Sequence, residues 1–124
     1  MTPIRTSIEI KQGVRTSLLL TPALYGCASA RGIDLSTRSG EDAKAVIRTY
    51  TKIAYCAAIN AWEVDSVDDP GKGEFPYSFA DFDAWAWSHP DEVKRIIDAV
   101  LVAFTGKTLK ESVADGVKKK TRAR

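Results

Sequence analysis

Residues 41–62 read EDAKAVIRTYTKIAYCAAINAW and hold the longest helical hydrophobic pattern in the chain. Apolar residues recur there at steps of three and four, so they share one stripe of an α-helix. The members of this stripe are Ala43, Val46, Ile47, Tyr50, Ile53, Ala54, Ala57 and Ala61. The basic residues on the opposite side are Lys44, Arg48 and Lys52. Ser39 can cap the helix, with Asp42 in its first turn. A helix of about six turns cannot bury such a stripe alone, so the flanking segments are expected to pack on it.

The length and composition fit one small globular domain. The chain has 124 residues, of which 44% are hydrophobic and 27% charged. A chain of this size buries about two-thirds of its unfolded surface, which is enough for a core. No apolar run approaches the roughly 18 residues of a membrane span, and the first residues do not resemble a signal peptide. We therefore expect a cytoplasmic protein with no membrane partner.

Positive charge is concentrated at the C-terminal end. Residues 107–124 hold seven basic and two acidic side chains, whereas residues 1–106 hold 11 basic and 14 acidic ones. Within the body, residues 63–92 carry nine carboxylates and only one cation, Lys72. Such a surface repels a phosphate backbone, which argues against nucleic acid as a partner of the body.

The N-terminal pattern predicts a β-hairpin. Ile8, Ile10, Val14 and Leu18 alternate with polar residues, a period of two that is typical of a half-buried strand. Pairing Ile10 with Val14 across a three-residue loop keeps this apolar set on one face and gives Gly13 the left-handed conformation that such loops need. A lone hairpin is marginal in water, so its apolar face must lie on helices.

Caps and breakers divide the rest into helices and loops. Strands are expected at about 7–11 and 14–20, and helices at about 22–31, 40–63, 79–87 and 90–105. The predicted fold class is mainly α (α+β): an N-terminal β-hairpin packed on a small bundle of about four helices. One domain would cover residues 1–106, followed by a basic, disordered tail over residues 107–124. The predicted core is drawn from Val46, Ile47, Tyr50, Ile53, Phe82, Ile96, Ile97, Val100 and Phe104.

The residues that could carry chemistry have simpler explanations. The one histidine, His89, lies in a Ser-x-Pro helix junction, where capping accounts for it better than catalysis. The acidic, unpatterned segment 65–74 reads as a surface loop, and it lacks the ligand spacing of a calcium loop. Cys27 and Cys56 fall on predicted helices without CxxC spacing, which favours buried, reduced thiols. We predict a protein that is not an enzyme and that takes no cofactor and no metal.

The tryptophans are better candidates for function. Trp85 and Trp87 lie about 200 degrees apart around a helix, so one of them is expected to be exposed. Trp62 ends the long helix beside the acidic segment, and Val102 lies opposite the apolar stripe of its own helix. An exposed aromatic side chain suits a partner anchor. The alternative is that Trp87 folds over the next helix near Pro90. The predicted partner-binding residues are Trp62, Trp85, Trp87 and Val102.

The order of these motifs resembles the tail assembly chaperones of long-tailed (siphophage-type) bacteriophages. The resemblance spans about residues 7–107. It rests chiefly on Phe79-x-x-Phe82-x-x-Trp85 and on His89-Pro90-Asp91-Glu92 leading into the last helix. The linker 65–77 and the tail after Thr108 depart from the family pattern.

The resemblance implies an assembly factor. Such proteins coat the helical tape-measure protein, keep it soluble, help to recruit tail-tube subunits and leave before the tail is finished. The expected partners are therefore the tape-measure and tail-tube proteins, with self-association as a further candidate. Two rival interpretations stay open. One is a structural head-to-tail connector or tail terminator, and the other is a regulatory module that binds nucleic acid through its basic tail.

The family is also known for a longer form made by programmed ribosomal frameshifting. The codons of Lys118-Lys119-Lys120 can form an A-rich run on which a ribosome slips. The alternative is a basic tail that aids solubility or binds an acidic surface loosely.

Overall fold

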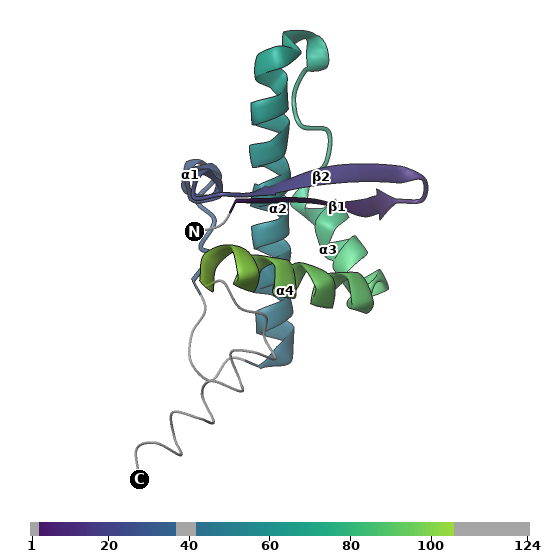
Figure 1. Cartoon of the computed structure of the whole chain (residues 1–124). Helices are drawn as coiled ribbons and strands as arrows, with labels where there is room; N and C mark the ends of the chain where they lie inside the picture. The colour runs from purple at the N-terminus through teal and green to yellow at the C-terminus, as the bar shows by residue number, and fades with distance from the viewer. Residues whose placement is uncertain (1–2, 37–41, 106–124) are drawn as a thin grey trace.

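A computed structural model of the chain describes residues 3–36 and 42–105 and shows a two-stranded hairpin packed against four helices (Figure 1). This confirms the predicted fold class. The elements in chain order are β1 (Ile4–Lys11), β2 (Val14–Leu20), α1 (Ala23–Ala30), α2 (Ala43–Asp68), the 3-10 turn η1 (Pro70–Lys72), α3 (Phe79–Ser88) and α4 (Pro90–Thr105). The predicted basic tail and Ser39 lie outside the described residues.

Helix α2 is the element on which the others pack. It contacts β2, α1, α3, α4 and η1, and the hairpin crosses it near the middle of its length (Figure 1). The central part of α2 is buried on nearly every side. Its buried residues there are Ala54, Cys56, Ala57, Ala58, Ile59, Asn60 and Ala61. The small side chains among them let several elements approach the same helix closely.

The stripe predicted for α2 is confirmed only in its second half. Ala54, Ala57 and Ala61 are buried, while Ala43 is exposed. The predicted core residues Val46, Ile47, Tyr50 and Ile53 are only half-buried. Because neighbours surround the middle of α2 and cover its first turns on one side only, burial does not follow a single stripe.

Both ends of α2 differ from the prediction. The helix begins at Ala43, and Asp42 is its cap, accepting a hydrogen bond of 2.8 Å from the amide of Ala45. At the other end α2 runs to Asp68, so the first part of the expected loop is helical. The helix can extend this far because no helix-breaking residue precedes Pro70. Within the extension, Asp65 forms ion pairs with Arg5 and Lys72.

The hairpin is confirmed, but its turn differs from the predicted alignment. Ile8 pairs with Thr16 as expected, whereas Val14 pairs with Lys11 and leaves Ile10 as the extra residue of a β-bulge. Gly13 has the left-handed conformation, with φ of 77°. The turn projects beyond α2 (Figure 1), so Val14 is 39% exposed and does not join the core face.

Helix side chains bond the outer carbonyls of the two strands. Arg95 of α4 donates to Ser7 O at 2.6 Å and to Thr6 Oγ1 at 2.8 Å. Asn60 of α2 donates to Leu19 O at 3.0 Å. These contacts anchor both strands of a sheet that would be marginal alone, and they occupy acceptors on its exposed edges.

Helix α1 ends at a glycine, and α3 begins with a capping box. Gly32, at φ of 66°, ends α1, and the amide of Ile33 reaches back to Ala28 O at 2.9 Å. At the start of α3 the amide of Ser78 donates to the Asp81 carboxylate at 2.9 Å. Of the remaining predicted core residues, those fully buried are Phe82, Ile96 and Val100, and those half-buried are Ile97 and Phe104.

The neighbouring isoleucines of α4 are expected to respond differently to truncation. Ile96 is buried in the core, so Ile96→Ala should lower the free energy of unfolding by about 2–5 kcal/mol. Ile97→Ala should cost clearly less, because Ile97 is half-buried. Denaturant melts measure both values, and equal costs would show that α4 packs with a different face.

The two cysteines are expected to react slowly in the folded protein. Burial raises the pKa of the Cys56 thiol to about 11, and burial with the nearby Glu63 carboxylate also raises the pKa of Cys27. At pH 8 a thiol with a pKa near 11 is only roughly one-thousandth thiolate, which is the reactive form. Reaction of the native protein with a disulfide reagent should keep accelerating above pH 9. In denaturant both thiols should react rapidly at pH 8, and equal rates in the native state would contradict the burial.

Candidate partner-binding site

The tryptophans at the end of α3 lie in opposite environments. Trp85 is 3% exposed, and its indole N–H is a buried donor without a hydrogen-bond partner among the described residues. Trp87 is 52% exposed. The two-residue spacing had predicted that one of them would be exposed, and the structure identifies Trp87.

The boundary between α3 and α4 places Trp87 at the surface. His89 ends the helix with a non-helical backbone, at φ of −135° and ψ of 65°, and its amide donates to Trp85 O at 2.9 Å. Pro90 then begins α4 in a new direction. Trp85 is directed into the core, so Trp87 points away from it, toward the space beside the first turns of α2.

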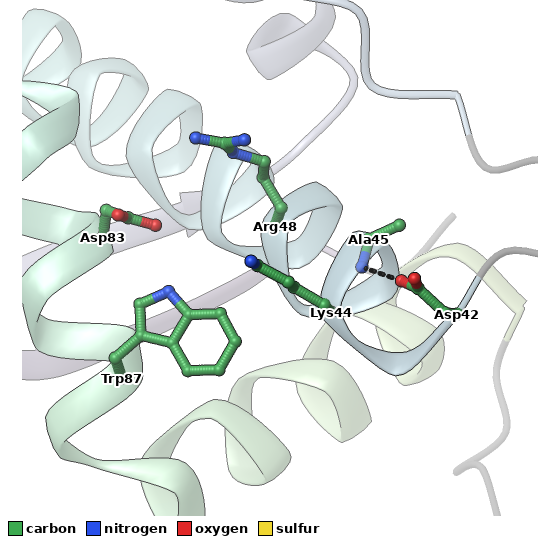
Figure 2. A pocket seen from close by; sticks show the side chains of 6 residues that line it. All are labelled: Asp42, Lys44, Ala45, Arg48, Asp83 and Trp87. Atoms are coloured by element: carbon green, nitrogen blue, oxygen red, sulfur yellow. Dashed lines mark hydrogen bonds between the residues drawn. The ribbon is translucent and has the colours of Figure 1, made fainter.

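A hollow of about 720 Å³ lies on one side of Trp87, and we call it the polar hollow because most of its lining residues are charged. Its walls come from the start of α2 and from α3, and the lining residues are Asp42, Lys44, Ala45, Arg48, Asp83 and Trp87. Figure 2 shows the indole facing the gap between the two helices, with Lys44 and Arg48 on the opposite wall. Asp42 is already engaged as the cap of α2.

A smaller, apolar hollow of about 220 Å³ lies on the other side of Trp87. It is lined by Ile47, Ala86, Trp87, Pro90, Val93, Lys94 and Ile97. Trp87 and Pro90 thus border the same hollow, and about half of the Trp87 surface stays open. We call the combined surface of Trp87, Ile47, Ile97, Lys44, Arg48 and Lys94 the tryptophan groove.

The tryptophan groove has cations at its rim that are unpaired in the described part of the chain. Within the described residues, no carboxylate lies at ion-pair distance from Lys44, Arg48 or Lys94. Asp83 faces the two cations of α2 across the polar hollow (Figure 2). These cations are thus available to an acidic ligand, and their long aliphatic stems can also cover apolar surface.

Trp62 has a different environment. Its indole N–H donates to Gly73 O at 2.9 Å, and the Lys72 ammonium lies 4.1 Å from its ring centre. Phe75 contacts the ring edge-on, with centroids 5.8 Å apart. These contacts fasten the segment after α2 back onto that helix, so Trp62 has a structural role in the chain itself.

The four predicted partner-binding residues do not form one site. Trp85 belongs to the core, Trp62 holds the linker, and Val102 is half-buried on α4. Only Trp87 combines large exposure with adjoining hollows. Ile47 and Ile97 were expected in the core, and Lys94 was not singled out. The one sequence feature that could have indicated these three residues is that they lie at the margins of the apolar stripes of their helices.

The described residues contain no group of three His, Cys, Asp or Glu side chains arranged to hold a metal ion. The His89 ring lies against the end of α3, with Nδ1 3.1 Å from Trp85 O. None of the described helices has the length and apolar character required to cross a membrane.

In comparisons with known proteins, no family model, no curated protein and no solved structure matches this chain. The link to tail assembly chaperones therefore rests on the sequence motifs. In the structure the aromatic motif packs the interior: Phe82 and Trp85 are buried, and Phe79 contacts Tyr55 with centroids 5.9 Å apart.

Fluorescence quenching should distinguish the three tryptophans. Because Trp87 has the most open indole, Trp87→Phe is expected to remove most of the emission that acrylamide quenches. Trp85→Phe should leave the quenchable fraction nearly unchanged and serves as the control. If the two variants show the same Stern–Volmer slope, Trp87 is covered in solution.

Proposed function

We propose that this protein is an assembly chaperone that binds a helical partner through the tryptophan groove, and that the partner is a phage tape-measure protein. The observation that carries the proposal is the half-exposed Trp87 between an apolar hollow and a basic wall. Large aromatic side chains in this setting dominate protein–protein binding energies.

The shape and chemistry of the groove suit an amphipathic helix. One apolar side chain of the partner can enter the hollow beside Ile47 and Ile97, while a neighbouring one packs on the indole. Lys44, Arg48 and Lys94 can meet polar or acidic residues at the edges of the same helix. The groove thus offers an anchor at its centre and a charged rim, the usual anatomy of a recognition surface.

The resemblance to tail assembly chaperones is the reason for proposing a tape-measure protein as the partner. In this proposal the protein covers tape-measure helices in the host cytoplasm, keeps them soluble and helps tail-tube subunits to assemble around them. A longer, frameshifted form belongs to the same proposal, and the residues where it would arise lie outside the described ranges.

Co-expression with a tape-measure segment tests the proposal. The wild-type protein should keep the segment soluble, and Trp87→Ala should weaken the complex by about thirtyfold, as expected for loss of an anchor worth about 2 kcal/mol. Val102→Asp shows whether the binding surface extends along α4. Pull-down and solubility assays measure both effects.

Val14→Asp is the matched control, because Val14 is an exposed apolar residue at the hairpin turn. If Trp87→Ala and Val102→Asp both fold and still solubilise the segment, the groove is not the binding site. Retention of the protein in finished phage particles would instead indicate a structural tail component.

A further inference from the structure

The C-terminal end of α2 carries an unusual pair of exposed apolar residues. Val67 is 81% exposed and Val64 is 46% exposed. They lie one helical turn apart on one face, and residues of the same turns are acidic. We call this surface the α2 apex; it consists of Glu63, Val64, Val67, Asp68 and Asp69.

The apex is held in a fixed orientation. Ser66 bonds Trp62 O at 2.7 Å within the helix, and the carboxylate of Asp65 pairs with Arg5 of β1 at 3.2 Å and with Lys72 of η1 at 3.8 Å. The two exposed valines therefore sit on an ordered helix, so little conformational entropy would be lost if they docked against a partner.

The apex and the tryptophan groove are complementary in chemistry. The apex offers two small apolar side chains among carboxylates. The groove offers an aromatic ring, an apolar hollow and three cations that form no ion pairs among the described residues. Two carboxylates, those of Asp42 and Asp83, line the polar hollow as well, and Asp42 is engaged as the cap of α2. Opposite charges at the rim steer two such surfaces together and fix their orientation.

The two surfaces cannot meet within one copy. The apex is the last part of α2, and the groove includes Lys44 and Arg48 from its first turns. A helix of 26 residues is about 39 Å long, and in Figure 1 the C-terminal turns of α2 project beyond the hairpin, away from α3 and α4.

We propose that the α2 apex of one copy docks into the tryptophan groove of a second copy, so that the protein associates head to tail. Val64 and Val67 pack on Trp87 and the apolar hollow, while Glu63, Asp68 and Asp69 face the groove cations. After the first contact the pair still has one free apex and one free groove, so association continues into an open chain or closes into a ring.

This inference stands independently of the tape-measure proposal. If both hold, the second copy and the helical partner compete for one groove, and added partner should dissociate the oligomers. If only self-association holds, sedimentation should show oligomers and the co-expression assay should fail. If only tape-measure binding holds, the reverse is expected.

Sedimentation of the full chain over a range of concentrations provides the first test. Wild-type mass should rise with concentration at about 0.05 M salt and fall at about 0.5 M, because salt screens the rim charges. Val67→Lys and Trp87→Ala should each weaken association at least tenfold. Thermal melts should show that both variants stay folded, and Val14→Lys, changed far from both surfaces, should associate like the wild type.

Mixing the two variants provides the sharper test. The Val67→Lys copy has an intact groove, and the Trp87→Ala copy has an intact apex, so an equimolar mixture should form one-to-one heterodimers and nothing larger. A wild-type protein that stays monomeric at low salt would overturn the inference. So would a mixture that stays monomeric, since that result excludes a contact between these two unlike surfaces.

Discussion

Burial around the middle of α2 is the constraint on which the rest of the fold depends. Small residues between Ala54 and Ala61 let the hairpin, α1 and α3 reach the helix from different directions. Asn60 is buried in this region, and it donates to Leu19 O and to Thr21 Oγ1 at 2.9 Å. A polar side chain satisfied in this way fixes where the end of β2 lies on the helix, since leaving it unpaired would cost about 1–3 kcal/mol.

The same constraint explains why both ends of α2 are available for binding. The elements that cover the helix gather at its centre, and the helix is longer than the body they form (Figure 1). Near its start, α3 and α4 leave a gap that Trp87 fills only in part. At its other end, Val67 is 81% exposed. At both ends of α2, therefore, apolar side chains are exposed where the helix lacks neighbours.

The helices and strands were predicted well because hydrophobic periodicity and helix-breaking residues are local properties of the sequence. Pro90 and Gly32 mark their helix boundaries by direct steric and conformational preference. Burial around α2 could not be predicted in the same way, since a periodic stripe describes one packed face and α2 has several. The bulge at Ile10 and the exposure of Val14 also depend on where the hairpin lies on the helices. The angle between Trp85 and Trp87 predicted one exposed tryptophan, but only the fold decides which.

The cations of this protein fall into two groups: those that bond other parts of the chain and those that form no ion pair among the described residues. Arg5, Lys72 and Arg95 bond carboxylates or strand carbonyls and hold elements together. The cations of the groove rim form no such bonds among the described residues, although carboxylates are abundant nearby in sequence. If the groove binds a partner as proposed, these rim charges would set the orientation and rate of association, while the aromatic ring would supply the binding energy.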